Sequence, residues 1–534
     1  LSACDALSRR LSDDSELREE LRQRAVAVGT VSEETFAAKL ELIANFLRPA
    51  SLRQKRSREL GETASRFPRR FDYRENLFEA YQPLGLLVHI ASGNSLTVGF
   101  LSVMEGLMAG NVNVLKTSRN DHGFSARLLA ALAESDPSDT IAPYLYCTEL
   151  SSSLKAELEK LLGCADGIAV WGGESAVAAV REVAPSRARV IPWGHKISFA
   201  FVAAERADNK GELEALAADC VWTEQQACSS PQVVYLETEN LEELHRFAEH
   251  FAPILDKVSR ATPALAPPPE VAAEITTVTE VHRIEALEGG RRVLEGQDRG
   301  WRILVEPLSP LQASPLYRTI WLKPLSANRI VETLRPMREY LQTVGLIAAP
   351  QRYPELSQQF FVAGVQRVRP AGSMARGYLG EPHDGVYALA CYSRRVSVDT
   401  GRALYDTTDF SQYLKLAPPS LASHPVTNRD DFQRLNMKEA DRGLLVRSGG
   451  SSSEPVYSVF EYEDYRHTML HAADGLLAAG LDPRTDRCMN MFASGKLYGG
   501  FLSFFTILED LQVLQFPEGQ HEDYEAIATR LESL

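Results

Sequence analysis

Hydrophobic and polar positions along the chain follow two patterns. Short apolar runs bounded by Gly, Pro or Asn are typical of buried parallel strands, and apolar positions three or four residues apart predict helices. Between residues 84 and 192 the two patterns alternate, which predicts an α/β fold with a doubly wound parallel sheet of the Rossmann type. The predicted strands are 84–91, 112–115, 140–146, 167–171 and 188–192, and the predicted helices are 100–109, 126–134, 154–162 and 174–183.

The same patterns divide the rest of the chain. The first 80 residues are polar and helical, and the basic run Arg53–Arg70 is expected to be a solvated surface. A second α/β unit begins near Phe199, with strands at 233–236, 301–305 and 319–322 and helices at 212–220 and 241–258. A loop-like stretch with Pro418-Pro419 predicts a linker. The predicted domains are 1–198 (helices and dinucleotide binding), 199–370 (catalytic), 371–400 (closing segment), 401–432 (linker) and 433–534.

Composition narrows the class of protein. The 534 residues are 44% hydrophobic and 24% charged, as in soluble globular proteins. A net charge of −14 without a basic block argues against a nucleic-acid partner. No apolar run approaches the ~20 residues of a membrane span. Seven scattered cysteines without metal-ligand spacing predict free thiols in a reducing cytoplasm and no metal site. The chain opens on Leu1, with no initiator methionine and no signal-like segment, so it can be part of a longer protein.

One cysteine stands among small and polar residues. Cys228 lies in the stretch Thr223–Gln232, between a predicted helix and the predicted strand 233–236. A thiol at a loop or helix start would meet free backbone N–H groups and a helix dipole that favour the thiolate. From the local residues alone, a partly buried free cysteine is the better-supported alternative.

Polar residues follow three predicted strands of the first sheet, where doubly wound sheets bind ligands. These segments are Ser92–Ser95, Lys116–Arg119 and Gly172–Ser175. The last one opens a helix, so its N–H groups could meet a phosphate, although a tight structural turn fits equally well. Lys116 and Arg119 could also be ordinary surface charges.

The order of these segments resembles the aldehyde dehydrogenase superfamily over residues 75–400, and most closely its LuxC branch of fatty acyl-CoA reductases. The resemblance rests on Pro83-Leu-Gly-Leu-Leu-Val-His-Ile with Ser92-Gly-Asn94, Gly106-Leu-Met-Ala-Gly-Asn-Val-Asn-Val-Leu-Lys116-Thr-Ser, Trp171-Gly-Gly-Glu-Ser and Gln225-Gln-Ala-Cys228. It implies that Cys228 is the nucleophile, and that Asn94 and the Cys228 backbone N–H stabilise the oxyanion. The cofactor would be held by Lys116, Ser118, Arg119, Gly172, Gly173, Glu174 and Ser175.

Three departures from the family pattern sharpen the expectation. Pro192 replaces the glutamate base of hydrolytic aldehyde dehydrogenases in Pro192-Trp-Gly-His-Lys196, and a proline cannot activate water. Arg119 stands where NAD-preferring members often have an acid, which favours NADPH. The family's Glu-x-Phe-Gly-Pro motif has no clean match, and Ser314–Arg318 occupies that region. His195 and His383 stand in motif-like places, where structural roles are expected.

The C-terminal part contains the segments Ser448-Gly-Gly-Ser-Ser-Ser-Glu-Pro455, Tyr462-Glu-Asp-Tyr and Asn490-Met-Phe-Ala-Ser-Gly-Lys-Leu-Tyr-Gly-Gly500. These segments resemble another family, the adenylate-forming enzymes of the phenylacetate–CoA ligase and LuxE acyl-protein synthetase type. The resemblance implies an ATP phosphate loop and Mg²⁺, although Val456 stands where the usual lysine is expected and the later motifs are missing. Judged by its composition alone, the same Ser/Gly segment could be a surface loop. The implied phosphate-loop residues are Ser448, Gly449, Gly450, Ser451, Ser452 and Ser453.

The resulting hypothesis is an NADPH-dependent reductase that converts a long-chain fatty acyl-CoA or acyl-carrier thioester into fatty aldehyde through an acyl-Cys228 intermediate. A fused ATP-dependent domain would activate the free acid, and the family resemblance implies a homo-oligomer. The alternatives are a CoA-acylating dehydrogenase of short-chain aldehydes and a scaffold whose ligase-like part only docks partners.

Overall fold

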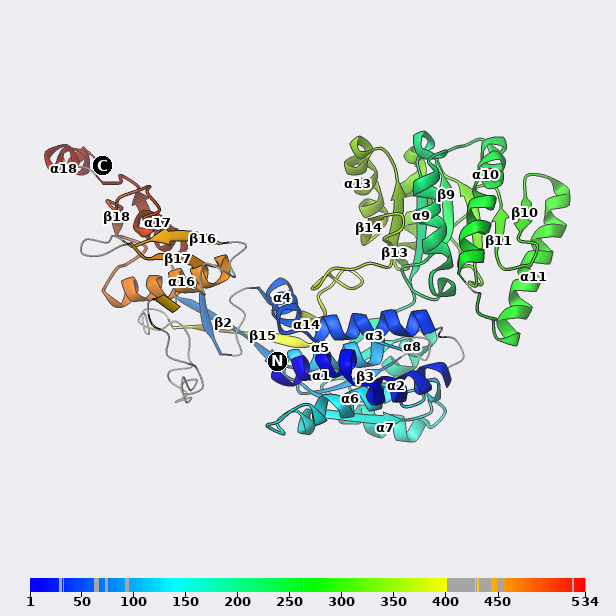
Figure 1. The fold of residues 1–534 in the computed structure, drawn as a ribbon, viewed down its shortest axis with the longest axis horizontal. Helices are drawn as coiled ribbons and strands as arrows, with labels where there is room; N and C mark the ends of the chain where they lie inside the picture. Colours follow the sequence, from blue (N-terminus) through cyan, green and yellow to red (C-terminus); the bar gives the residue numbers. More distant parts are fainter. Residues whose placement is uncertain are drawn as a thin grey trace. The chain divides into compact units, whose positions relative to one another are not determined.

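The computed structural model describes residues 1–27, 31, 33–61, 67–72, 75–91, 96–262, 264–400, 428, 430–431, 443–448, 455–520 and 523–533. The chain, traced in Figure 1, forms two compact units. The first contains Leu1–Glu59 and Pro83–Tyr392, and the second contains Leu60–Gln82 and Ser393–Leu534. Apart from Asn428, Asp430 and Asp431, the predicted linker 401–432 lies outside the described residues.

The first unit begins with a parallel five-stranded sheet in the order β5-β4-β3-β6-β7, which confirms the predicted doubly wound arrangement. One predicted strand is displaced along the chain. Residues 142–144 form a 3-10 turn with Pro143 near its start, where the fixed φ of proline fits and its missing N–H is not needed. The strands are β3 (Leu86–Ile90), β4 (Val112–Thr117), β5 (Leu145–Glu149), β6 (Gly167–Trp171) and β7 (Arg189–Trp193).

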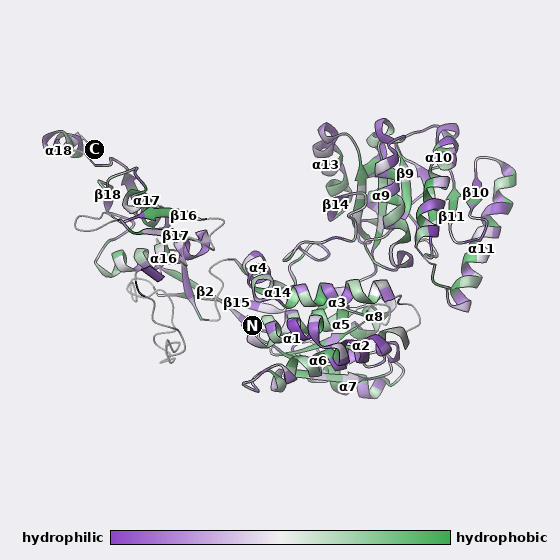
Figure 2. Ribbon diagram, viewed as in Figure 1, coloured by the Kyte–Doolittle hydropathy of each residue, from purple (hydrophilic) through white to green (hydrophobic). Residues whose placement is uncertain are grey.

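Helices cover both faces of this sheet. On one face, α5 (Val98–Met108) and α6 (Phe124–Glu134) share an apolar core with the N-terminal helices. On the other face, α7 (Lys155–Gly163) and α8 (Glu174–Val183) share a core with β3 and β6. In Figure 2, the N-terminal helix α2 is predominantly hydrophilic. The N-terminal helices are α1 (Ser2–Asp13), α2 (Ser15–Ala27), α3 (Glu33–Leu47) and α4 (Pro49–Leu60).

The second sheet of this unit has seven strands in the order β10-β11-β12-β9-β8-β13-β14. All neighbours are parallel except β10 and β11, which form an antiparallel pair. The central strands β8 and β9 are buried along their whole length, as expected of a sheet covered on both faces. The strands are β8 (Ile197–Val202), β9 (Pro231–Leu236), β10 (Arg292–Glu295), β11 (Arg302–Val305), β12 (Thr319–Pro324), β13 (Leu341–Ile347) and β14 (Arg367–Pro370).

Two helical layers enclose the second sheet. One contains α9 (Lys210–Val221) and α10 (Leu241–Ala261), and the other contains α12 (Ile330–Leu334) and α13 (Tyr353–Ala363). Helix α11 (Pro269–Glu285) precedes the antiparallel pair, and the short helix α14 (Ala388–Cys391) ends the unit. The alternation predicted for this half of the chain is therefore confirmed.

The second unit contains a three-stranded sheet, β1-β2-β15, and two small two-stranded sheets. Strands β16 and β17 are antiparallel, and β18 and β19 are parallel. The elements are β1 (Arg69–Asp72), β2 (Leu77–Pro83), β15 (Ser393–Asp399), β16 (Leu444–Arg447), β17 (Tyr457–Phe460), α16 (Tyr462–Ala478), β18 (Arg487–Met489), α17 (Gly500–Asp510), β19 (Leu514–Phe516) and α18 (Tyr524–Ser533). Among the helices described, none is long and apolar enough to span a bilayer.

The prediction of a solvated basic surface at Arg53–Arg70 is wrong at two positions. Lys55 is buried in the first unit, where it pairs with Glu59 and with Glu105. Arg70 is buried in the second unit, with its guanidinium over the Phe78 ring at 4.7 Å. Both cations therefore hold elements together, because a buried charge needs partners that replace water.

Candidate active site

Cys228 lies in a turn between a 3-10 helix, η4 (Trp222–Gln225), and strand β9. The residue is exposed. Its carbonyl oxygen accepts a hydrogen bond of 2.6 Å from Ser198 Oγ, which itself accepts one of 3.2 Å from the backbone N–H of Thr343. The turn is thus fastened to the neighbouring strands β8 and β13.

The segment leading into this turn has an unusual backbone. Thr223, Glu224 and Gln225 all have left-handed conformations, with φ values of 47°, 53° and 62°. Such conformations cost roughly 1–3 kcal/mol each for residues with a Cβ and persist only where their surroundings hold them. They are frequent at functional sites, and here they lie immediately before the candidate nucleophile.

A second left-handed segment holds the first in place. Leu316, Tyr317 and Arg318 have φ values of 63°, 48° and 60°. The backbone N–H of Tyr317 donates to the carbonyl oxygen of Glu224 at 3.0 Å, and the Arg318 guanidinium binds the Glu224 carboxylate. The sequence Ser314–Arg318, which showed no cofactor motif, therefore braces the turn that carries Cys228.

The sulfur of Cys228 contacts one polar side chain from the sheet. Gln342 Nε2, on β13, lies 3.4 Å from Cys228 Sγ and donates a second hydrogen bond of 2.7 Å to Asp384 Oδ1. Although the residue as a whole is exposed, burial of its sulfur raises the pKa of the Cys228 thiol, and the Gln342 hydrogen bond acts to lower it. The Asp384 charge raises this pKa further, whereas Arg367 and the backbone N–H of Cys228 lower it.

Of the two settings predicted for Cys228, a loop or a helix start, the structure shows the loop. The thiol follows the C-terminal end of a short 3-10 helix and precedes a strand, so no helix dipole favours its thiolate. The predicted oxyanion donor Asn94 lies outside the described residues. The second predicted donor, the Cys228 backbone N–H, lies in the described turn.

Three predicted cofactor residues follow strand β4. Lys116 is buried, its Nζ donates to Ser152 Oγ at 3.1 Å, and burial lowers its pKa. Ser118 Oγ is buried without a hydrogen-bond partner among the described residues. Arg119 is exposed at the start of a 3-10 turn. A buried amine and an orphaned hydroxyl beside an exposed guanidinium fit a ligand with ribose hydroxyls and a phosphate.

The other predicted cofactor residues follow strand β6. Gly173 caps helix α8, and a Cβ added there would meet nothing within 4 Å, so that the backbone lies open to a ligand. Ser175 is exposed in the first turn. Glu174 accepts a hydrogen bond from Tyr340 Oη, which connects the start of α8 to the residue before β13. Gly172 is more confined, because its added Cβ would lie 3.0 Å from the Ala176 Cβ.

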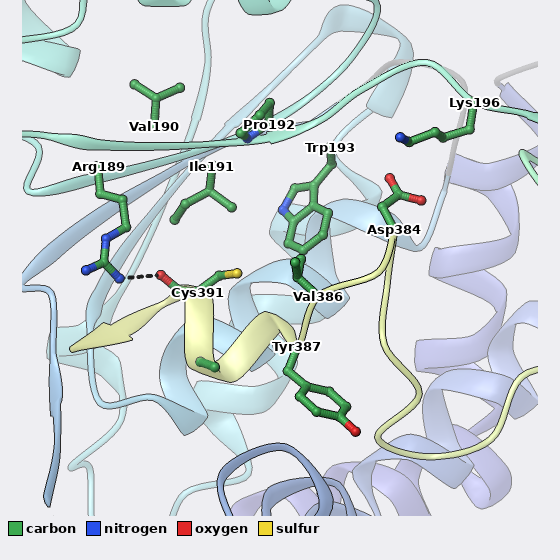
Figure 3. Close-up of a pocket in the computed structure, with 11 residues that line it drawn as sticks. Arg189, Val190, Ile191, Pro192, Trp193, Lys196, Asp384, Val386, Tyr387 and Cys391 are labelled. Carbon is green, nitrogen blue, oxygen red and sulfur yellow. Dashed lines mark hydrogen bonds between the residues drawn. The ribbon is translucent and has the colours of Figure 1, made fainter. Parts of the chain in front are cut away.

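A cavity of about 750 Å³ lies between the edge strand β7 and the segment that leads into α14 (Figure 3). Pro192 and Asp384 both line it, with Arg189 and Cys391 at another part of the wall, joined by a 3.1 Å hydrogen bond from Arg189 to the Cys391 carbonyl. Pro192 brings no carboxylate to this cavity. Asp384 does, from a distant part of the sequence.

His383 packs among aromatic rings. Its ring centroid lies 5.1 Å from that of Trp171 and 5.0 Å from that of Trp193, and burial lowers its pKa. His383 Nε2 is 3.8 Å from Asp384 Oδ2. The aromatic contacts favour the structural role expected for His383. His195 is exposed.

Only Ser448 of the predicted phosphate loop lies within the described residues; Gly449, Gly450, Ser451, Ser452 and Ser453 lie outside them. The Ser448 backbone N–H donates to the carbonyl of Val456 at 2.8 Å, and the Val456 N–H donates to Ser448 Oγ at 2.9 Å. These bonds continue the β16–β17 hairpin, so the segment between them joins two antiparallel strands. No group of three or more metal-ligating side chains is present among the described residues.

Comparison with known proteins decides the family of the chain. The sequence profile described as "Acyl-CoA reductase (LuxC)" matches residues 1–395. This chain belongs to the LuxC family. The resemblance drawn from the motifs is thereby confirmed for the reductase, whereas the family match ends before the ligase-like part.

Curated LuxC relatives are distant. A "Long-chain acyl-protein thioester reductase" of Aliivibrio fischeri is 26% identical over 59% of this chain and 64% of its own length. The "Long-chain acyl-protein thioester reductase 2" of Photobacterium leiognathi is 24% identical over 62% of this chain and 67% of its own length. The chain thus matches about two thirds or less of each relative's length.

Solved structures show the same fold at low identity. Glyceraldehyde-3-phosphate dehydrogenase GapN of Methanocaldococcus jannaschii, complexed with NADP, superposes with a TM-score of 0.56 and 13% identity. The match covers 74% of this LuxC-family chain and 88% of GapN. The aldehyde dehydrogenase-like fold predicted from the sequence is therefore confirmed.

Two residues of the site were not predicted from the sequence. Gln342 lies on β13 and Asp384 lies in the loop before α14, more than a hundred residues beyond Cys228. A glutamine near the start of the apolar run Leu341–Ile347 is a usable signal, because a buried polar side chain requires partners. Asp384 carries no comparable signal.

Proposed function

We propose that this chain reduces a long-chain fatty acyl thioester to the fatty aldehyde with NADPH, through an acyl group carried on Cys228. One observation carries the proposal: a cysteine at an exposed position, on a braced turn with an amide donor at its sulfur, occurs in a chain of the LuxC family. The alternative of a partly buried free cysteine does not explain why two left-handed segments brace the turn that carries it.

The reaction begins with attack of the Cys228 thiolate on the acyl carbonyl carbon. A carbon–sulfur bond forms to Cys228, the bond to the donor sulfur breaks, and the donor leaves as a thiol after taking a proton. The Cys228 backbone N–H and Asn94 are proposed to stabilise the oxyanion, a role worth about 3 kcal/mol per donor in known enzymes.

When bound, a reduced nicotinamide dinucleotide would supply a hydride to the acyl carbon. The carbon–sulfur bond would then break, giving fatty aldehyde and the Cys228 thiolate. The chain's own contribution is binding and orientation. Lys116 and Ser118 are proposed to hold the adenosine ribose, Arg119 a 2′-phosphate, and the open backbone at Gly173 the diphosphate side, with Gly172, Glu174 and Ser175 completing the turn. The arginine favours NADPH over NADH.

The acyl group is proposed to leave by reduction instead of hydrolysis. Pro192 lines the cavity without offering a base, and the Asp384 carboxylate in the same cavity is engaged by Gln342. The donor thiol is either coenzyme A, as in the description of the family, or a protein thiol, as in the names of the acyl-protein thioester reductases among the relatives.

Consumption of NADPH in the presence of acyl thioesters of different chain length tests this function. We expect turnover with long-chain substrates, aldehyde as product, and loss of turnover in Cys228→Ala. Equal or better turnover of short-chain thioesters would favour a CoA-acylating short-chain dehydrogenase. The absence of NADPH consumption with every thioester, in folded protein, would favour the scaffold alternative.

We further propose that the C-terminal part activates fatty acid with ATP and Mg²⁺ and passes it to the reductase. Supporting this, the Ser448 segment joins two antiparallel strands as a phosphate loop between paired strands would. Fusion would raise the effective concentration of the acyl donor near Cys228. Fatty-acid-dependent exchange of pyrophosphate into ATP tests the proposal, and its absence in a chain that still reduces acyl thioesters would reject it.

The assembly and location of the chain are also proposals. A cytoplasmic homo-oligomer is expected from the family resemblance and the scattered free cysteines. Light scattering of the purified chain measures the oligomeric state, and fractionation of cells measures the location. A strictly monomeric particle, or a membrane-bound one, would contradict them.

A further inference from the structure

The polar group that touches the Cys228 sulfur belongs to a pair of side chains. We propose that Gln342 is a further catalytic residue, the donor of a hydrogen bond to the Cys228 sulfur, and that Asp384 is the positioning residue that orients its amide. The inference rests on the proposed function in one respect, that Cys228 is the nucleophile.

The geometry uses both hydrogens of one amide nitrogen. Gln342 Nε2 lies 3.4 Å from Cys228 Sγ and 2.7 Å from Asp384 Oδ1. An amide NH₂ group has two donors, so one hydrogen can point to each acceptor. Sulfur accepts hydrogen bonds more strongly as a thiolate than as a thiol, and the contact therefore gains strength as charge develops on Sγ.

Asp384 decides which end of the amide faces the sulfur. An ionised carboxylate only accepts hydrogen bonds, so it pairs with Nε2 and would repel Oε1 of Gln342. The Asp384 side chain is only 8% exposed, which strengthens this preference because little water competes for it. The donor is consequently turned toward Cys228 and not away from it.

The orientation leaves part of Gln342 unsatisfied. Gln342 is 5% exposed, and its Oε1 is buried without a hydrogen-bond partner among the described residues. A glutamine that only filled space in β13 would be expected to satisfy its carbonyl oxygen, since an unpaired buried acceptor is costly. The free-energy cost of the unpaired Oε1 is explained if the amide is oriented so that its nitrogen can donate to Cys228 and Asp384.

Other charged groups around the sulfur are accounted for. Arg367 on β14 lowers the thiol pKa from a distance, while its guanidinium is engaged by Glu381 at 3.2 Å. Glu224, from the segment before the turn, is neutralised by Arg318. His383 lies beside Asp384 in the loop before α14, at 3.8 Å. Gln342 is thus the side chain that can stabilise a negative charge on Sγ by direct contact.

The test measures the thiol itself, without thioester or cofactor, so that it stays informative even if the proposed reductase activity fails. In the full chain, alkylation of each cysteine by iodoacetamide is followed by peptide mass spectrometry from about pH 6 to about pH 11. Exposed Cys164 is the internal control for reagent and pH. Fully buried Cys220 reports unfolding, because it reacts only when the fold opens.

Gln342→Met removes the donor while keeping the side-chain length. We expect the pKa of the Cys228 thiol to rise by about one unit, and the alkylation rate below that pKa to fall roughly tenfold. Cys164 and Cys220 should be unchanged. An unchanged Cys228 profile with Cys220 still protected would overturn the role of Gln342. If the Met variant exposes Cys220, Gln342→Leu serves as the second variant, because it also removes the donor without adding a charge, and the same rise is expected.

The positioning role of Asp384 needs a double-mutant comparison. In the Gln342→Met background, Asp384→Asn only removes a negative charge, so the Cys228 pKa should fall. In the wild-type background the same change also frees the Gln342 amide to turn, so the pKa should fall less or rise. A difference of about threefold or more in alkylation rate between the two backgrounds supports coupling. Equal shifts would show that Asp384 acts as a charge alone and would overturn its positioning role.

Discussion

Glu224 and Arg318 form a buried, two-pronged ion pair between segments that are 94 residues apart. Arg318 Nε donates to Glu224 Oε2 at 3.0 Å and Nη2 donates to Oε1 at 2.7 Å, with side-chain exposures of 1% and 5%. The remaining Arg318 nitrogen, Nη1, donates to the Ser259 hydroxyl and to two carbonyl oxygens. The pair locks together the left-handed segments on which the Cys228 turn rests.

Arg318→Met should therefore be strongly destabilising. The change leaves the Glu224 carboxylate buried without its partner, which typically costs about 3–5 kcal/mol of unfolding free energy. Arg260→Met is the matched control, because Arg260 pairs with Asp256 at 2.8 Å but is 59% exposed, and such pairs contribute about 1 kcal/mol or less. Urea unfolding measures both. Similar losses in the two variants would contradict the bracing role of Arg318.

Pro192→Glu should introduce hydrolysis. A carboxylate at this position would face the cavity that Pro192 lines and could take a proton from water, so fatty acid released from an acyl thioester without cofactor should rise at least about tenfold. Val190→Glu adds the same charge two residues earlier on β7, in the wall of the same cavity. If both variants released acid at the wild-type rate, the absence of a base at position 192 would not explain the fate of the acyl group.

Arg119→Ser should weaken the preference for NADPH. Removing the exposed guanidinium should raise the KM for NADPH about tenfold and leave the KM for NADH nearly unchanged, since only NADPH carries the 2′-phosphate. Arg181→Ser, at an exposed position on α8, controls for general loss of positive charge. Equal changes in the KM values for NADPH and NADH would show that Arg119 does not bind the 2′-phosphate.

Asp219 gives the fold a pH dependence of its own. Burial raises the pKa of Asp219 to about 6, against about 4 in an unfolded chain, although it accepts a hydrogen bond from the Gly372 N–H at 2.6 Å. A raised acid pKa means that the folded state favours the protonated form, so its contribution to stability is complete below about pH 4 and is lost as the pH rises through about 6.

Asp219→Asn keeps an acceptor for Gly372 and removes the titration. The variant should lose less stability than the wild type between about pH 4 and about pH 7, by about 3 kcal/mol, as measured by urea unfolding at each pH. Asp208→Asn, in the turn before α9, is the control for general removal of a carboxylate. Parallel pH profiles for wild type and Asp219→Asn would contradict the raised pKa.

Much of the fold could be predicted because the central strands of the two large sheets are mostly buried on both faces. Strands such as 167–171 and helices such as 174–183 coincide with β6 and α8, since their apolar runs and glycine boundaries are local signals. The displaced strand at β5 shows the limit, because apolar residues around Pro143 read equally well as a turn and as a strand.

The surroundings of Cys228 could be predicted only in part. Cys228, the proposed nucleophile, and the motif Gln225–Ala227 are contiguous in sequence, whereas the groups that affect its pKa are not. Gln342 and Asp384 reach it from β13 and from the loop before α14, and Glu224 is held by Arg318. No local pattern joins such residues, because their contacts depend on the order of strands in the sheet. Likewise, Lys55 looked like part of a solvated basic run until its buried acidic partners were visible.

The covalent step at Cys228 is the most direct test of the account. The chain is mixed with a long-chain acyl thioester without cofactor, and the acyl group is located by peptide mass spectrometry. We predict one acyl group per chain, on Cys228, with release of the donor thiol and conversion to fatty aldehyde when NADPH is added. Cys228→Ala should neither become acylated nor consume NADPH. Normal reduction by Cys228→Ala, or acylation at another residue, would contradict the central claim.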